Sequence, residues 1–109
     1  MPRMMRIKMI YLRQIRSGEK KVEIRVAYSG LKNIESGTLV NFCSGNESQL
    51  VRISEVRRYA DFVSMLKVEK PEDVIAGEKN VAKVLSILRS IYPPDKEGLG
   101  VIVLQLELQ

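Results

Sequence analysis

Histidine is absent from this sequence of 109 residues, and cysteine occurs only once, as Cys43. Without histidine the chain cannot form a Ser-His-Asp triad, a Cys-His pair or a histidine zinc site. A single cysteine excludes an internal disulfide and a metal cluster of several cysteines. No compact group of carboxylates indicates a magnesium site. We therefore expect no metal and no cofactor, and any catalysis must use Lys, Glu, Asp, Tyr, Thr, Ser or Cys43.

Long hydrophobic runs are missing too. No stretch approaches the roughly 18 to 20 apolar residues that span a membrane, and residues 1–12 are too charged for the apolar core of a signal peptide. The lone cysteine suits a reducing compartment, so we expect a cytoplasmic protein with no membrane partner. The length and the 45% apolar content predict a single domain over residues 1–109.

Positive charge is concentrated near the N-terminus. Residues 1–32 contain nine lysines and arginines against Glu19 and Glu23, a net charge of +7, whereas the remaining residues carry a net charge of −2. A concentrated basic surface attracts phosphates and other anions. The alternative is a surface that excess lysine and arginine simply keep soluble, and the charge pattern leaves both interpretations open.

The hydrophobic pattern predicts strands interrupted by helices. Strands are expected at residues 4–9, 21–26, 39–43, 50–59 and 99–108, and helices at residues 10–17, 62–69, a short turn from 71, and 81–92. Asp61 and Asn80 stand where they can cap the helices that follow. The last strand has one fully apolar face, which indicates that it belongs to the core. This order predicts an α+β domain or a small curled barrel, with helices covering an open side or an end.

In the first predicted helix, Ile10, Leu12 and Ile15 are expected to face inward, and Gly18 to end the helix in the left-handed conformation. Periodicity places Tyr92 in the core. Cys43 is expected to serve packing, because no base is available to it. The basic residues of the fourth strand either extend a binding surface or face water; they are Arg52, Arg57 and Arg58.

Residues 21–26 alternate between apolar and charged side chains. Glu23 and Arg25 share one face with Lys21, whereas Lys20 is out of phase and can reach that face only from the turn before the strand. One interpretation is an exposed ion pair of Glu23 and Arg25, worth about 0 to 1 kcal/mol. The other is a binding site in which Arg25 grips a phosphate or a base edge through its planar fork. Burial decides between the two.

The segment "GEKKVEIR" matches the pattern G-x-K-x-x-E-x-R, with Gly18, Lys20, Glu23 and Arg25 at its fixed positions. This pattern resembles the signature of the ASCH domain family. The segments "IESGTLVNF", "VRISEVRRYADFVSML" and "LRSIYPPDKEGLGVIVLQLE" are similar to that family as well. The resemblance covers most of the chain and is closest to the small single-domain members found in archaea and bacteria.

The resemblance implies a PUA-like mixed β-barrel and a cleft between the barrel and its covering helices. It also implies an RNA or nucleotide ligand in that cleft, in a role linked to translation or RNA modification. The signature residues Gly18, Lys20, Glu23 and Arg25 would line the cleft. The following loop, with Tyr28, Ser29 and Lys32, is expected to border it, since loops often carry binding residues.

An alternative is a hydrolase, because the family includes a branch that deacylates acetylcytidine and a member described as a ribonuclease. The deacylase uses a lysine, a threonine and a glutamate. Its lysine corresponds to Lys20, but Glu23 stands in the place of its threonine and cannot act as a hydroxyl nucleophile. A water-mediated variant would use Lys20, Glu23 and Glu78. A protein-interaction domain without chemistry is a third possibility. The threonine mismatch favours binding over catalysis.

Overall fold

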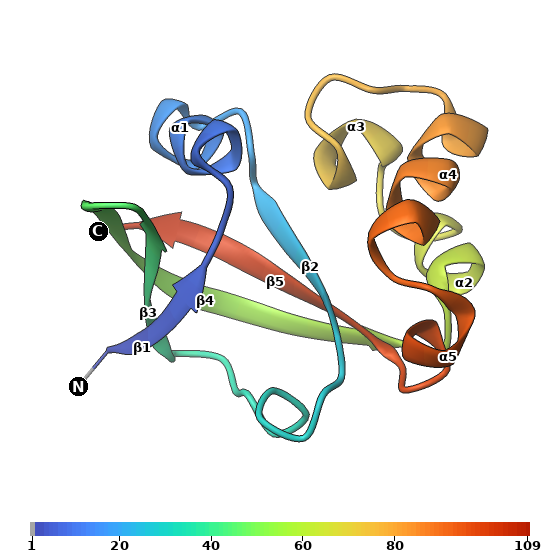
Figure 1. Cartoon of the computed structure of the whole chain (residues 1–109), viewed down its shortest axis with the longest axis horizontal. Coiled ribbons are helices and arrows are strands. Elements are labelled where there is room, and N and C mark those ends of the chain that lie inside the picture. Colours follow the sequence, from blue (N-terminus) through green and yellow to red (C-terminus); the bar gives the residue numbers. More distant parts are fainter. Residues whose placement is uncertain (1) are drawn as a thin grey trace.

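The computed structural model describes residues 2–109 and contains one five-stranded sheet with the strand order β1-β3-β4-β5-β2 (Figure 1). β1 runs parallel to β3, and every other neighbouring pair is antiparallel. The strands are β1 (Arg3–Arg6), β2 (Val22–Val26), β3 (Leu39–Ser44), β4 (Glu47–Tyr59) and β5 (Val101–Leu108). This arrangement confirms the α+β class and leaves β1 and β2 as the two edges of the sheet.

The helices are α1 (Met9–Ser17), α2 (Phe62–Leu66), α3 (Pro71–Val74), α4 (Val81–Ile91) and α5 (Pro94–Glu97). The sequence predicts the first four and misses α5, because the two consecutive prolines indicated only the end of a helix. Pro94 stands at the first position of α5, where its missing N–H costs no hydrogen bond. Among the helices of residues 2–109, none is long and apolar enough to cross a membrane.

The sheet curls into a half-open barrel, so that its two edge strands approach each other. Arg25 on β2 donates a hydrogen bond from Nη2 to the main-chain carbonyl of Arg6 on β1, over 2.8 Å. The helix α1 connects the two strands along the chain (Figure 1). The place where the barrel stays open is therefore the gap between β1 and β2, and we call this gap the seam.

Apolar side chains fill both faces of the sheet. On the face that α1 covers, the buried core includes Leu12, Ile15, Phe42, Ile53 and Leu104. On the opposite face, α2, α3 and α4 cover residues that include Val26, Phe62, Met65, Val84 and Val103. The expectation of one apolar face on the last strand is too narrow, because β5 lies inside the sheet and is buried on both sides from Val101 to Leu104.

Several local signals act as expected. Gly18 follows α1 with a φ of 84° and closes the helix in the left-handed conformation. Asp61 and Asn80 cap α2 and α4 through hydrogen bonds from main-chain N–H groups. The inward orientation predicted for Ile10 is wrong, since its side chain is exposed. Ile10 and Leu12 are two residues apart, about 200° around the helix axis, so they cannot share a buried face.

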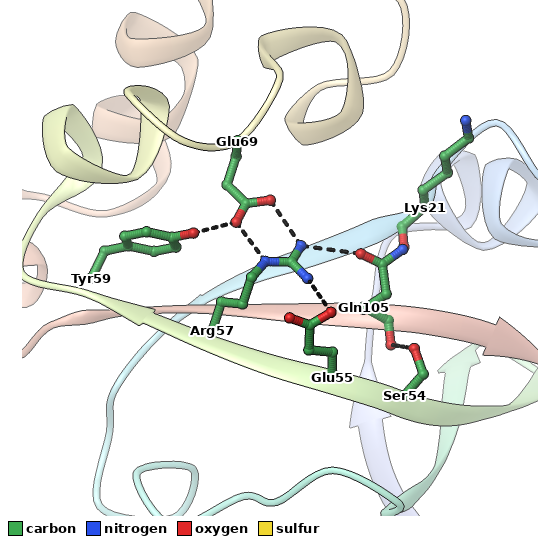
Figure 2. Close-up of polar contacts among 7 residues, drawn as sticks. All are labelled: Lys21, Ser54, Glu55, Arg57, Tyr59, Glu69 and Gln105. Carbon is green, nitrogen blue, oxygen red and sulfur yellow. Dashed lines mark hydrogen bonds and ion pairs between the residues drawn. The ribbon is translucent and has the colours of Figure 1, made fainter.

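A bulge in β4 determines which face Arg57 occupies. The register with β5 shifts between Ile53 and Glu55, and Ser54 is the extra residue. Arg57 therefore points toward the segment between α2 and α3, where its Nε and Nη2 bind both carboxylate oxygens of Glu69 at 2.6 and 2.8 Å (Figure 2). Tyr59 donates its hydroxyl to the same carboxylate. We call Arg57, Tyr59 and Glu69 the β4 clamp.

Candidate functional site

A cleft of about 200 Å³ lies at the seam, along the outer edge of β2. One side is formed by the end of β1 and the start of α1, through residues that include Arg6, Lys8 and Tyr11. The opposite side comes from α3, α4 and the residues after them, and includes Val74, Ile75, Leu88, Ile91 and Tyr92. Between the two sides lie Lys20 and the β2 residues Glu23, Ile24 and Arg25. Three of the four signature residues therefore line one cleft.

The turn after α1 brings Lys20 into this cleft. Gly18 ends the helix with positive φ, and the main-chain N–H of Lys20 then donates to the carbonyl of Gln14 over 3.0 Å. This tight return places Lys20 before the first residue of β2, out of phase with the strand. The expected position of Lys20 in the turn is thus confirmed, and Lys20 is buried there.

Lys20, Glu23 and Arg25 form one buried ion cluster, which we call the cleft triad. Lys20 Nζ lies 3.0 Å from Glu23 Oε1, and Arg25 contacts Glu23 Oε2 through Nε and Nη2, both at 2.8 Å. The side chains of Lys20, Glu23 and Arg25 are 8%, 9% and 22% exposed. The interpretation as an exposed ion pair is therefore wrong. Removing one partner of a buried pair typically costs about 3 to 5 kcal/mol.

Two tyrosines complete the site, and the sequence predicted neither of them there. The Lys20 ammonium lies 5.3 Å from the centroid of the Tyr11 ring, within cation–π range. Tyr92 packs against the core as expected, but it also lines the cleft and donates its hydroxyl to the Ile24 carbonyl over 3.4 Å. Burial raises the pKa of Tyr92, so its hydroxyl stays protonated and acts as a donor.

The cleft carries a net positive charge. Arg6, Lys8, Lys20 and Arg25 line it against the single carboxylate of Glu23, so the lining holds a net charge of +3. Arg6 and Lys8 are exposed, whereas Lys20 is buried. A concave site with an excess of cations attracts anionic ligands and holds them more strongly than a flat surface does. The N-terminal excess of basic residues is thus partly gathered at one site.

The loop residues predicted at the cleft border lie elsewhere. Tyr28, Ser29 and Lys32 are exposed and do not line the cleft, and the Tyr28 ring faces the ammonium of Lys96 at 5.6 Å. The reason is that β2 continues to Val26 and stays paired with β5, which carries the loop past the seam. Gly18 also lies outside the lining, and it acts through the main-chain turn. Ligand binding by these four residues stays a prediction.

The three residues of the hydrolytic alternative are not all brought together. Lys20 and Glu23 are in contact, but Glu78 lies between α3 and α4, outside the lining of the cleft. Its carboxylate accepts the main-chain N–H of Asn80 over 3.2 Å. Within residues 2–109, no group of three or more His, Cys, Asp or Glu side chains is placed to hold a metal ion.

The arginines of β4 are engaged within the protein. Arg52 and Arg58 donate to the main-chain carbonyls of Gly37 and Ile34, over 3.1 and 2.8 Å, and Arg57 belongs to the β4 clamp. The bonds of Arg52 and Arg58 hold the loop between β2 and β3 against the sheet, and those of Arg57 hold the segment between α2 and α3. An additional basic binding surface on β4 therefore gains no support.

A second and wider groove of about 680 Å³ runs beside β1. Its lining includes Met4, Met5 and Cys43, and Arg6 is its one charged member. Ligand sites usually combine an apolar wall with several polar groups that converge on the ligand. The groove beside β1 has one charged residue, whereas the smaller cleft gathers five beside its apolar wall, so we take the cleft as the candidate site.

Comparisons with known proteins agree with this architecture. The family model of the ASCH domain matches residues 5–107. The crystal structure of the hypothetical protein PH0355 superposes with a TM-score of 0.89 at 27% identity, covering 100% of both chains. The solution structure of protein PF0455 from Pyrococcus furiosus gives a TM-score of 0.79 at 28% identity, covering 99% of this chain and 97% of the other.

A comparison with curated proteins found no match. The family model nevertheless spans almost all of the sequence, and the half-open barrel agrees with the PUA-like fold that the signature residues implied. The chain belongs to the ASCH domain family.

Proposed function

We propose that the protein binds single-stranded RNA or a nucleotide in the cleft at the seam. The observation that carries this proposal is the cleft triad, a buried carboxylate held between two cations inside a cleft with a net charge of +3. PUA-like domains of this family are often linked to RNA binding, and this supports the choice of a nucleic-acid ligand among anions.

The triad keeps donors available for a ligand. Lys20 has three ammonium protons, and Glu23 is its one ion-pair partner among the described residues. Arg25 directs Nε and Nη2 to Glu23 and Arg6, and its Nη1 has no acceptor within residues 2–109. Glu23 thus orients both cations while leaving part of each free. Phosphate oxygens and base acceptors are suitable partners for such groups.

Hydrolysis receives less support from this geometry. Each oxygen of Glu23 is already held by a cation, and Glu78 is outside the cleft, so none of the described residues presents a free carboxylate to the cleft. A general base must lie within hydrogen-bond reach of the water it activates. We therefore expect incubation with acetylcytidine or short RNAs to give no turnover, and turnover that Lys20→Ala abolishes would favour the hydrolase.

The proposal is tested by the binding of fluorescently labelled single-stranded RNA, followed by anisotropy. Lys20→Ala and Arg25→Ala should each weaken binding by about 10-fold or more, since hydrogen bonds to charged groups are worth about 1.5 to 3 kcal/mol. Lys21→Ala and Arg13→Ala are matched controls, because both side chains are basic, exposed and outside the cleft lining. These controls should change affinity by less than about 2-fold.

Salt gives a second readout. Binding should weaken steeply between about 50 and 200 mM salt, because the cations release counterions from the phosphates. Lys20→Ala should reduce the slope of the logarithm of affinity against the logarithm of salt concentration by about 1, because one phosphate contact is lost. Absence of binding even at low salt, or an equal loss in the control variants, would overturn the proposal.

A further inference from the structure

The main chain of Ile24 faces the cleft. In the antiparallel pair of β2 and β5, Leu106 N–H donates to the Lys21 carbonyl and Ala27 N–H donates to the Gly100 carbonyl, both over 2.9 Å. Hydrogen-bonded positions alternate along such a pair. The odd-numbered residues of β2 therefore point their main-chain groups at β5. The N–H and C=O of Ile24 point the other way, toward the open edge of the sheet.

These two groups are incompletely partnered. The Ile24 carbonyl receives only the long contact of 3.4 Å from Tyr92. No described residue accepts a hydrogen bond from the Ile24 N–H, although Ile24 is only 6% exposed. An N–H without an acceptor destabilises the folded protein when water cannot reach it. Such groups are rare in folded proteins, and because Ile24 lines the cleft, a group bound there can supply the missing acceptor.

The free edge is short, and of Val22, Ile24 and Val26, which all turn their main chains toward it, only Ile24 lines the cleft. Val26 also turns its main chain to the free edge, but its carbonyl accepts the N–H of Tyr28 over 2.9 Å. An added peptide strand needs a run of free main-chain groups, and this run is interrupted at Val26. A compact ligand that meets one residue fits the edge better than an extended peptide does.

The size of the cleft sets the size of that ligand. A volume of about 200 Å³ exceeds the roughly 150 Å³ of an apolar cavity that can hold benzene. It is below the roughly 300 Å³ at which pockets for drug-sized ligands begin. The cleft can therefore hold one planar ring system and not a stacked pair. Val74, Ile75 and Leu88 supply apolar surface for the faces of such a ring.

We propose that the cleft holds a single unstacked nucleobase whose edge hydrogen bonds to the N–H and C=O of Ile24. This rests on the proposed function and names the part of the nucleic acid that enters the cleft. Lys20 and Arg25 line the same cleft and would hold the attached sugar and phosphate. Single-stranded RNA offers such bases, because its loops and ends can turn a base out and expose its Watson–Crick edge.

The test uses amide NMR of the complete protein with free nucleosides. Uridine and adenosine should shift the Ile24 amide resonance and slow its hydrogen exchange. Analogues with a blocked edge, 3-methyluridine and N6,N6-dimethyladenosine, should bind at least about 5-fold more weakly, because one main-chain hydrogen bond is lost. Ribose 5-phosphate has no base and should leave the Ile24 amide unchanged. The Val26 amide, next on the same edge, is the internal control.

The outcomes separate this proposal from the function on which it rests. If RNA binds but nucleosides do not move the Ile24 amide, or ribose 5-phosphate moves it equally, the base does not enter the cleft and phosphate contacts alone explain binding. If blocked analogues bind as well as the parent nucleosides, Ile24 does not read the base edge. Protection that spreads to the Val22 and Val26 amides would indicate a strand-like ligand. If RNA itself does not bind, both proposals fall.

Discussion

Two glutamates are buried to the same degree in this protein and have different surroundings. The Glu23 side chain is 9% exposed in the cleft triad, and the Glu69 side chain is 8% exposed in the β4 clamp. Glu69 meets one arginine, and that arginine also contacts the exposed carboxylate of Glu55 over 3.1 Å, so the group carries excess negative charge (Figure 2). Glu23 meets two cations, and two further cations line the same cleft.

The difference shows that a buried ion pair does not by itself identify a functional site. The β4 clamp is closed, because Arg57 also donates to Gln105, whose amide in turn donates to the Lys21 carbonyl. No member of the clamp lines the cleft. The cleft triad has surplus positive charge and free donors beside an open volume, and the Ile24 N–H, which has no acceptor among the described residues, faces the same cleft. We therefore interpret the clamp as structural and the triad as the binding site.

The strongest test of this contrast is Glu69→Gln. The change leaves Arg57 partly buried with only the exposed Glu55 as a charged partner, so the free energy of unfolding should fall by about 3 kcal/mol. Chemical denaturation measures this loss. RNA affinity, measured where the variant is folded, should change by less than about 2-fold. Glu55→Gln is the matched control and should cost less than about 1 kcal/mol. Lost affinity with intact stability would reverse the assignment.

Acid should remove the stabilisation that the ionised Glu69 carboxylate gives to the wild type. Burial raises the pKa of Glu69, but the hydrogen bonds from Arg57 and Tyr59 outweigh burial and hold the pKa below its ordinary value of 4.5. A lowered pKa means that the stabilisation is complete above about pH 4.5 and is lost as pH falls through the folded-state pKa. The stability difference between wild type and Glu69→Gln should therefore be constant at neutral pH and shrink in acid. A difference that grows in acid would contradict the clamp.

Replacing arginine by lysine should lower stability in the β4 clamp and RNA affinity in the cleft triad. Lysine keeps the charge but lacks the planar fork that contacts two acceptors at once. Arg57→Lys should lower the free energy of unfolding by about 1 to 2 kcal/mol and leave RNA affinity unchanged. Arg25→Lys should weaken RNA binding by about 5- to 10-fold, since the contacts with Glu23 and the Arg6 carbonyl cannot both be kept. Chemical denaturation of both variants measures the loss of stability, and RNA-binding anisotropy measures the loss of affinity.

The smallest effects should come from two tyrosine hydroxyls. Tyr59 donates to a buried carboxylate, so Tyr59→Phe should cost about 1 to 1.5 kcal/mol of unfolding free energy. Tyr92 makes only a long contact with the Ile24 carbonyl, so Tyr92→Phe should cost less than about 0.5 kcal/mol. The Ile24 amide should respond to nucleosides in the Tyr92 variant as in the wild type. The reverse order of stability losses would show that the two clusters have been assigned the wrong roles.

The sequence predicts where the site lies better than it predicts which residues line it and how deeply they are buried. The out-of-phase Lys20 after Gly18 indicates a turn, and the turn brings Lys20 to the carboxylate of Glu23. Local alternation and the family signature are enough for this part. Burial of Glu23 could not be predicted, since it arises at the seam, between α1 on one side of the cleft and α3 and α4 on the other.

The sequence does not predict features that depend on contacts between residues far apart along the chain. Tyr11 in α1 and Tyr92 directly after α4 are far apart in sequence, and only the curling of the sheet brings them to one cleft. The face occupied by Arg57 depends on the bulge at Ser54, which period-two counting does not detect. Glu78 was placed by its distance from a family motif, and the loop before α4 keeps it out of the cleft.

An amide NMR titration of the wild type with single-stranded RNA distinguishes binding at the cleft triad from binding elsewhere on the protein. We expect saturable shifts of the amide resonances of Lys20, Glu23 and Ile24 and of the facing residues Ile75 and Tyr92, with Arg57 and Glu69 unaffected. Shifts centred on Arg57 and Glu69, or spread evenly over the exposed lysines and arginines, would contradict binding at the cleft triad.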